Sequence, residues 1–297
     1  MNFTGLLQTS TSLCSFSPDG QYFATVDQHR LVIRSSTSAE ILHLFTCIDK
    51  IDTIEWASDS RLILGGLIER NVVQIFSLDF PEWKCKIDEG TVGLCQVHWA
   101  PDSRHILTTA QFHIRITVWS LTSKNVSYMK YPKKISPTSY VFSSRKPLMA
   151  LAERRSDHSD HISIFDYSNH WSVVGHFRAK HFQDLQGIQW SPIDDVLCLW
   201  ENCSEYEILF YSLTGKPLRL FRPENDDHLS LGVRCAQWSP TGQLLIVGDY
   251  NSSITIFVYL TYQKLCGPID CPRKLKSGHG YVILKEEFQT DDENEMM

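Results

Sequence analysis

The densest group of ionisable side chains lies in the run AERRSDHSDH, residues 152–161. His158 and His161 have a His-x-x-His spacing that can place two imidazoles on one metal ion, with Asp157 or Asp160 as a further ligand. A structural zinc site needs four ligands, and nothing nearby in the sequence supplies the rest. The run is better explained as a polar, solvated loop, so we predict neither a metal nor a cofactor.

No other arrangement of residues points to a chemical reaction. The pair Gly65 and Gly66 lacks the Lys-Ser/Thr that follows the glycine in a phosphate-binding loop. A Gly-x-Ser-x-Gly nucleophile elbow and the paired motifs of kinases and zinc hydrolases are absent from the sequence. We therefore predict that the protein is not an enzyme and takes no small-molecule substrate.

Five basic residues form the one charge feature that stands out. Lys130, Lys133 and Lys134 lie in the run KYPKK, and Arg154 and Arg155 follow about twenty residues later. If their loops meet, these residues form a positive patch that can orient an acidic partner. The alternative is a solvated surface without a binding role.

Charge and composition exclude several classes of protein. The net charge is -6, from 28 basic and 34 acidic side chains, so no broad positive field exists to bind nucleic acid. No apolar run approaches the roughly 20 residues that cross a bilayer, and the first residues lack a secretion signal. We expect a cytoplasmic protein whose nine cysteines are reduced and mostly buried, including those in strand-like segments: Cys14, Cys47, Cys85, Cys95, Cys198 and Cys235.

The elements that position these residues follow from an internal repeat. One signature recurs as CSFSPDG, IEWASDS, VHWAPDS, YVFSSRK, IQWSPID and AQWSPTG. Its aromatic residues are spaced by 40, 43, 43, 48 and 48 positions and are Phe16, Trp56, Trp99, Phe142, Trp190 and Trp238. Each signature predicts a strand that ends in a turn, because Ser-Pro-Asp-Gly supplies Pro and Gly where a turn requires them.

Three more strands follow each signature. The second is short and apolar, as in HILTTA, and the third alternates as in RITVWSL, which is typical of a half-buried strand. A fourth, more variable strand follows, as in SYMKYP. Four antiparallel strands in each of at least six units predict an all-β propeller, with a possible incomplete seventh blade.

The FSPDG turn and the aromatic residue of RITVWSL resemble WD40 repeats. The Trp-Asp pair of such repeats is lost, since Trp119 is followed by Ser120, and only the fourth unit keeps an aspartate there, Asp166. The Gly-His pair of a standard repeat is also missing, so the Asp-His-Ser/Thr-Trp hydrogen-bond network of the family is not expected. We predict that apolar packing holds the blades instead.

A narrower resemblance covers most of the chain. The runs EWKCKIDEG, HIRITVWSL, SYMKYPK and MALAERR, between residues 82 and 155, are similar to those of the WD repeat-containing protein eight family. That resemblance implies a scaffold at centrosomes, centriolar satellites and spindle poles, in spindle anchoring and assembly, centriole function and cilium formation. It also implies a coiled-coil satellite or spindle-anchoring protein as the partner, and a link to a minus-end-directed kinesin.

Domain limits follow from the repeat. We expect a propeller over residues 1–287, a disordered acidic tail over 288–297, and blades that begin near residues 14, 54, 97, 140, 188 and 236. Residues 2–8 are placed to supply the outer strand of the final blade, with 280–287 as the rival.

Two other functions stay open at this point. WD40 domains also serve as substrate receptors of ubiquitin ligases, but their usual Trp-Asp-x-Arg marker is replaced here by Trp119-Ser-Leu-Thr. Scattered Ser, His and Asp side chains could also converge in the central channel, as they do in enzymes built on propellers.

Overall fold

The computed structural model describes most of the chain between residues 13 and 270. The described ranges are 13–135, 137–155, 157–182, 184–193, 195–201, 206–221, 232–250, 253–258 and the backbone of 263–270. Within these ranges, no helix has the length and apolar character to cross a membrane.

Six antiparallel sheets of four strands each follow one another along the chain, and each sheet takes its strands in sequence order. We number these blades one to six. The inner strand comes first in every blade: β1 (Cys14–Phe16), β5 (Thr53–Trp56), β9 (Leu94–Trp99), β13 (Tyr140–Phe142), β17 (Leu185–Trp190) and β21 (Val233–Trp238). The second strands are β2 (Tyr22–Asp27), β6 (Leu62–Leu67), β10 (His105–Ala110), β14 (Leu148–Arg154), β18 (Val196–Glu201) and β22 (Leu244–Asp249).

The third and fourth strands complete each blade toward its outer edge. The third strands are β3 (Arg30–Ser35), β7 (Val72–Ser77), β11 (Arg115–Ser120), β15 (Asp160–Asp166), β19 (Ile208–Ser212) and β23 (Ser253–Val258). The outer strands are β4 (Ile41–Thr46), β8 (Lys84–Asp88), β12 (Val126–Lys130), β16 (Ser172–Arg178), β20 (Pro217–Phe221) and β24 (Gln263–Asp270). Three short 3-10 turns lie in the loops: η1 (Ile68–Arg70), η2 (Gly90–Val92) and η3 (Gln111–His113).

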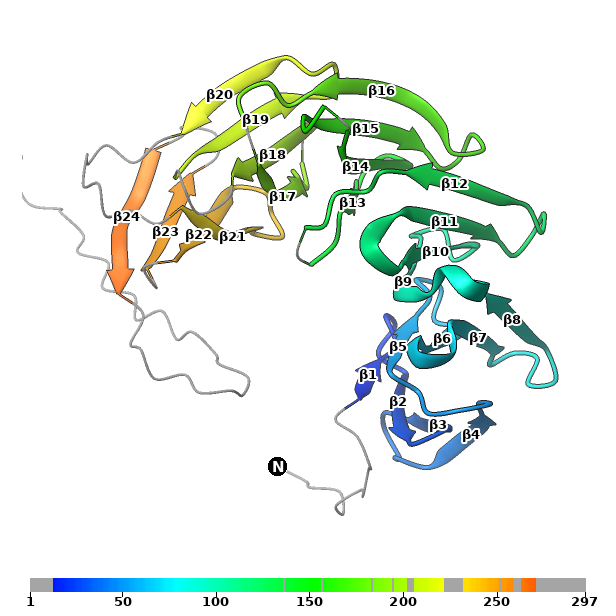
Figure 1. The fold of residues 1–297 in the computed structure, drawn as a ribbon. Helices are drawn as coiled ribbons and strands as arrows, with labels where there is room; N and C mark the ends of the chain where they lie inside the picture. Colours follow the sequence, from blue (N-terminus) through cyan, green and yellow to red (C-terminus); the bar gives the residue numbers. More distant parts are fainter. Residues whose placement is uncertain are drawn as a thin grey trace, which may run out of the picture.

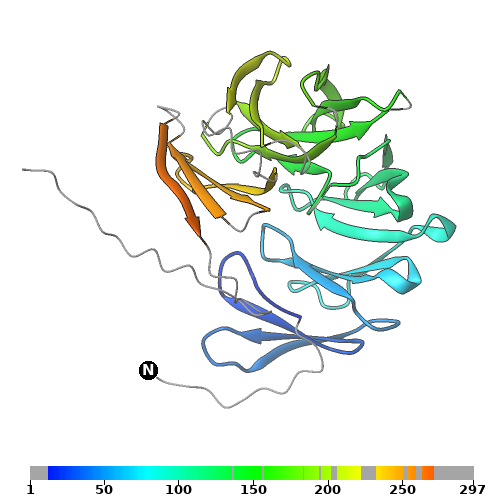
Figure 2. The same ribbon diagram turned by 60° about the vertical axis from the view of Figure 1, so that its left-hand side comes forward.

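The blades stand side by side around an arc, with β1–β4 at one end and β21–β24 at the other (Figures 1 and 2). This arrangement confirms the prediction of a propeller with at least six four-stranded blades. Because the strands of a blade alternate in direction, its loops divide between two faces. We call the side with the links between blades and between second and third strands the connecting face, and the opposite side the turn face.

The core is built between blades rather than within them. Trp56, Trp99, Trp190 and Trp238 occupy the same inner-strand position and are only 5–6% exposed, because each packs against the preceding blade. The indole nitrogens of Trp56 and Trp99 also donate to the backbone oxygens of Ser15 and Glu55, both at 3.1 Å.

Phe16 holds the same position in blade one, yet it is 63% exposed. No described blade precedes blade one, so the face that carries Phe16 has no sheet to pack against among the described residues. Phe142, the counterpart in blade four, is half-buried and packs at the edge of the core between blades three and four.

Blade three contradicts the expectation that apolar packing alone holds the blades. The carboxylate of Glu89 is buried, and its Oε1 accepts a hydrogen bond from the indole nitrogen of Trp119 at 3.1 Å and another from the hydroxyl of Thr108. The same indole lies 2.9 Å from Oγ1 of Thr108, and Arg115 lies 3.5 Å from Oε2 of Glu89. Glu89 comes from the link between blades, so a carboxylate supplies the polar group at the place where the missing Gly-His pair would lie.

The outer strand of blade six is β24, from Gln263–Asp270. This sheet is therefore complete without residues 2–8, contrary to the expectation that those residues would supply its outer strand. Residues 2–8, 280–287 and the acidic tail 288–297 lie outside the described part of the chain. The six inner strands begin at residues 14, 53, 94, 140, 185 and 233.

The cysteines differ from expectation in their burial. The six cysteines whose side chains the structure describes are free thiols, but Cys14, Cys95 and Cys235 are exposed. Only Cys47 and Cys198 are buried, and burial raises the pKa of the Cys47 thiol to about 12. The prediction that the thiols are mostly buried is therefore wrong for the described cysteines, because inner strands turn alternate side chains away from the core.

Candidate protein-docking surface

The two basic runs meet on the connecting face of blade four. The link from blade three runs alongside the end of β14, where the amide of Lys133 donates to the oxygen of Ala152 at 2.9 Å. One step further along, the amide of Arg154 donates to the oxygen of Tyr131 at 3.0 Å. These backbone bonds bring residues 130–134 and 154–155 into one neighbourhood.

Lys133 is not part of an exposed patch. Its ammonium is 8% exposed and lies 2.5 Å from Oδ2 of Asp160 and 2.7 Å from Oδ1 of Asp184. Asp160 is fully buried and also accepts a hydrogen bond from the amide of Leu185 at 2.7 Å. Lys133 therefore joins the link, blade four and blade five, and reversing its charge would damage the fold.

Arg154 belongs to the same ion network. Its guanidinium lies 3.0 Å from Oδ1 of Asp160 and 3.1 Å from Oδ1 of Asp184. Two cations and two carboxylates thus satisfy one another at the junction of blades four and five. A buried carboxylate such as Asp160 needs such partners, because an unpaired charge in the interior is very costly.

Arg155 lies on the other side of β14 and is half-exposed. Its guanidinium lies 3.3 Å from Oε2 of Glu153 and 3.3 Å from Nε2 of His176. The imidazole of His176 stacks on that of His161, with Nδ1 of His161 3.1 Å from Nε2 of His176. Burial, His176 and Arg155 lower the pKa of His161, in that order.

Lys130 and Lys134 are exposed, and neither forms an ion pair with any described residue. The expected patch of five thus resolves into two exposed lysines, the half-exposed Arg155 and two members of a structural ion network. A role in partner binding stays a prediction for Lys130, Lys134 and Arg155.

The candidate metal ligands predicted from the sequence contact different partners. Asp160 forms ion pairs with Lys133 and Arg154. His161 forms hydrogen bonds with His176 and with the hydroxyl of Ser159, the latter at 2.9 Å. Within the described ranges, no group of three or more His, Cys, Asp or Glu side chains is arranged to hold a metal ion.

A hollow lies along the inner strands, where the sequence left open a convergence of Ser, His and Asp side chains. It has a volume of about 490 Å³ and is bordered by the inner strands of blades four to six. Gln189 and Gln237 bridge two of these strands with a side-chain hydrogen bond of 3.1 Å. Among the described residues that line this hollow there is no His, Asp or Glu, so they provide no acid–base pair.

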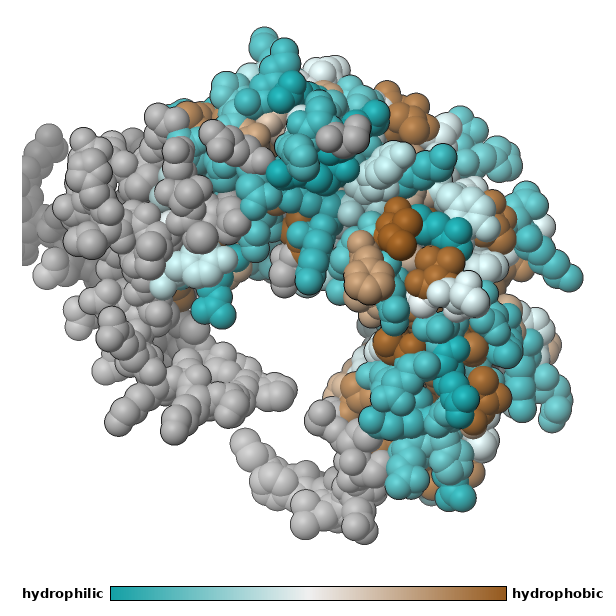
Figure 3. Space-filling model, viewed as in Figure 1, coloured by the Kyte–Doolittle hydropathy of each residue, from teal (hydrophilic) through white to brown (hydrophobic). Residues whose placement is uncertain are grey.

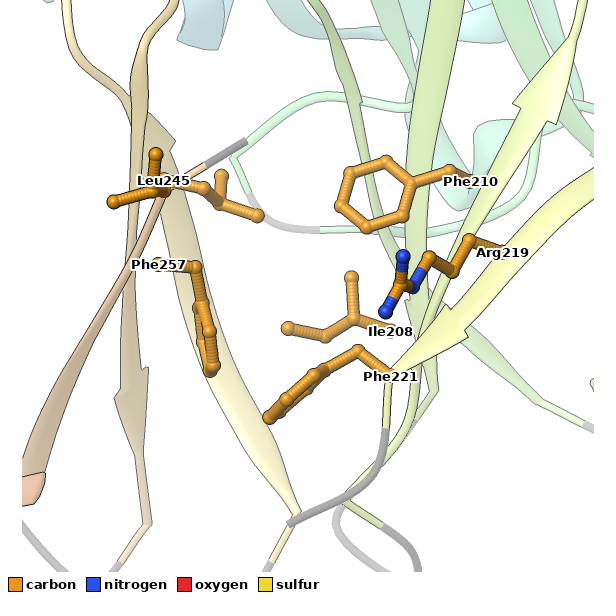
Figure 4. A pocket seen from close by; sticks show the side chains of 7 residues that line it. Ile208, Phe210, Arg219, Phe221, Leu245 and Phe257 are labelled. Atoms are coloured by element: carbon orange, nitrogen blue, oxygen red, sulfur yellow. The ribbon is translucent and has the colours of Figure 1, made fainter. Parts of the chain in front are cut away.

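A second, apolar space lies between the outer parts of blades five and six (Figure 4). The rings of Phe221 and Phe257 face one another across it, with centroids 4.1 Å apart, and Arg219 closes one side. The space holds only about 20 Å³, room for roughly one water molecule. It is therefore a packing gap between blades rather than a ligand site.

Three exposed apolar side chains, which no sequence pattern predicted, lie beside Lys130 and Lys134. Phe112 is 90% exposed, while Ile114 and Tyr131 are each 59% exposed. Hydrophobic residues gather in Figure 3 at the place where Figure 1 draws η3. For Ile114 the reason is the alternation of HIRITVWSL, which places this residue in a strand pattern and gives no sign that the strand begins only at Arg115.

Known proteins resemble this chain in sequence and in fold. The family model "WD domain, G-beta repeat" matches residues 215–257. The mouse protein "WD repeat-containing protein WRAP73" is 46% identical over 265 residues, which cover 89% of this chain and 56% of that protein. An uncharacterised WD repeat-containing protein of Schizosaccharomyces pombe is 24% identical over 267 residues, which cover 85% of this chain and 53% of that protein.

A solved structure supports the fold alone. The protein KlHsv2, with its loop 6CD replaced by a Gly-Ser linker, superposes with a TM-score of 0.60 at 12% identity. The match covers 89% of this chain and 82% of that one. This chain spans little more than half the length of the mouse and fission-yeast relatives.

Proposed function

The chain is a WD40 repeat protein with the fold of a β-propeller, and from that premise we propose that it is a non-catalytic scaffold which binds proteins at the centrosome and spindle pole. WD40 propellers are suited to protein–protein interaction, because packing fixes their strands while their loops are free to vary. Here the observation that carries the proposal is the connecting face of blades three and four, where apolar and basic side chains are exposed together.

The location within the cell is supported by motif resemblance. The runs between residues 82 and 155 are similar to those of the WD repeat-containing protein eight family, whose members are found at centrosomes, centriolar satellites and spindle poles. We therefore extend the proposal to spindle anchoring and assembly, centriole function and cilium formation. The proposed partner is a coiled-coil satellite or spindle-anchoring protein, with a minus-end-directed kinesin in the same assembly.

The test is proximity labelling in dividing cells, with the chain fused to a biotin ligase. We expect coiled-coil proteins of the spindle pole and centriolar satellites to be labelled well above the level given by the free ligase. A fusion that carries Trp99→Ala is the matched control, because loss of this buried indole should unfold a blade and remove the labelling. Labelling no different from that of the free ligase, or dominated by ubiquitin-ligase adaptors, would refute the proposal.

A further inference from the structure

Phe112 has a backbone conformation that its residue type disfavours. Its φ is 58°, in the left-handed region, and the next residue, His113, has a φ of 52°. The corresponding loops of blades one, two and four also contain a left-handed residue, but there it is Gln28, Asn71 and His158. Polar residues are common in this conformation, whereas a bulky aromatic residue is an outlier.

The loop that carries Phe112 is held firmly by its neighbours. The amide of Gln111 donates to the oxygen of Gly93 at 3.3 Å, and the side chain of Gln111 packs so closely on Gly93 that a Cβ there would lie 2.5 Å from its Cδ. Gly93 itself has a φ of 79°. The ring of Phe112 is thus presented to solvent by a loop that is anchored at Gly93.

Two more apolar side chains lie next to this loop. Arg115 of β11 pairs with Lys130 of β12, so the positions one step beyond them, Ile114 and Tyr131, are neighbours across the end of the ladder. Tyr131 also has a left-handed φ, of 59°. Phe112, Ile114 and Tyr131 therefore form one exposed apolar cluster on the connecting face, which we call the Phe112 cluster.

Two exposed lysines lie near the Phe112 cluster. Lys130 directly precedes Tyr131, and Lys134 lies close enough to His113 that burial and this lysine together lower the pKa of the imidazole. Neither lysine forms an ion pair within the described ranges. Large exposed apolar side chains beside unpaired lysines are typical of a docking site for an acidic partner.

We propose that the Phe112 cluster is the primary docking site of this scaffold, and that its occupant is an acidic segment of a partner protein with at least one large apolar side chain. The inference rests on the proposed function, which it deepens by naming the surface and the chemistry of the partner. The apolar side chain of the partner packs against Phe112, Ile114 and Tyr131. Carboxylates beside it pair with Lys130 and Lys134.

The test uses peptides selected from a random display library on the purified full chain, followed by titration of the strongest synthetic peptide. We expect the selected peptides to be rich in Asp and Glu around an aromatic or long aliphatic residue. The Phe112→Asn variant should raise the Kd about ten-fold or more and leave Tm equal or higher, because asparagine suits the left-handed position.

Matched controls separate this surface from general stickiness. Phe80 is 70% exposed on the turn face, so Phe80→Asn should leave the Kd unchanged. The pair Lys130→Glu and Lys134→Glu should weaken binding about ten-fold, most clearly at low salt, whereas Lys124→Glu on the turn face should have no effect.

Several results would overturn the inference. The display library could yield no binding peptide, or only peptides without acidic or apolar residues. Phe112→Asn could also leave the Kd of the selected peptide unchanged. A dimer of the chain that Phe112→Asn dissociates would assign the surface to a second copy instead. Failure of the proposed function is seen in a different experiment. In that case the wild-type biotin-ligase fusion labels no spindle-pole protein, whichever peptides are selected.

Discussion

The ammonium nitrogen of Lys133 lies 2.5 Å from a carboxylate oxygen of Asp160, and both side chains are buried. The sequence places Lys133 beside the exposed Lys134 in one basic run, yet the two lysines have different roles. Lys133 compensates a carboxylate that water does not reach, while Lys134 points into solvent.

Replacement of Lys133 should therefore cost far more stability than replacement of Lys134. We expect Lys133→Met to lower the free energy of unfolding by about 3 kcal/mol or more, because among the described cations it leaves the buried Asp160 with Arg154 alone. Lys134→Met should change it by less than about 0.5 kcal/mol. Urea unfolding followed by circular dichroism measures both, and equal losses would contradict the assigned roles.

The carboxylate of Glu89 should be energetically coupled to the indole of Trp119. Their hydrogen bond is 3.1 Å long and inaccessible to solvent at Glu89. In a double-mutant cycle, Glu89→Gln and Trp119→Phe should show a coupling of about 1 kcal/mol. Trp119→Phe combined with Glu55→Gln should be additive, because no hydrogen bond joins these two described side chains. Additivity in both cycles would show that Glu89 and Trp119 are not coupled.

Equivalent positions in different blades should differ in their contribution to stability. Trp99→Ala should lower the free energy of unfolding by about 3–5 kcal/mol, since this indole is 5% exposed between two blades. Phe16→Ala should cost under about 1 kcal/mol, because the ring is 63% exposed. Thermal unfolding of both variants tests this, and an equally large loss for Phe16→Ala would show that another segment covers that face.

Acidification should destabilise the protein through His161. Burial, His176 and Arg155 lower its pKa in the folded state, so the unfolded chain binds the proton more readily as the pH falls through about 6.5, the usual pKa of histidine. Stability should thus decrease from pH 7.5 to 5.5, and His113, whose pKa is also lowered, contributes with the same sign. His161→Gln should flatten the dependence of Tm on pH, and an unchanged slope would exclude this histidine as a cause.

The fold could be predicted from the sequence because its cause is local and repeated. The aromatic residues at Phe16, Trp56, Trp99, Phe142, Trp190 and Trp238 mark the inner strands, and the turn residues after them fix where each strand ends. The binding surface could be predicted only in part. Nothing in KYPKK distinguishes the buried Lys133 from its exposed neighbours, because its partners Asp160 and Asp184 are 27 and 51 residues away.

Two further features depend on contacts that no local pattern reveals. Glu89 replaces the polar group of the missing Gly-His pair, but this is evident only once Thr108 and Trp119 are seen to converge on it. Phe112 is exposed and has a left-handed backbone, and the residue before it packs on Gly93, which lies 19 positions before Phe112 in the chain. An aromatic residue in a β-rich sequence would otherwise be assigned to the core.

Amine cross-linking of complexes isolated from dividing cells, followed by mass spectrometry, shows whether the connecting face of blades three and four binds spindle-pole proteins. Lys130 and Lys134 lie at this face, and Lys124, Lys146 and Lys216 lie in loops of the turn face. We expect the cross-links to coiled-coil spindle-pole proteins to be concentrated at Lys130 and Lys134. Cross-links concentrated at Lys124, Lys146 and Lys216, or none to spindle-pole proteins, would contradict the proposal.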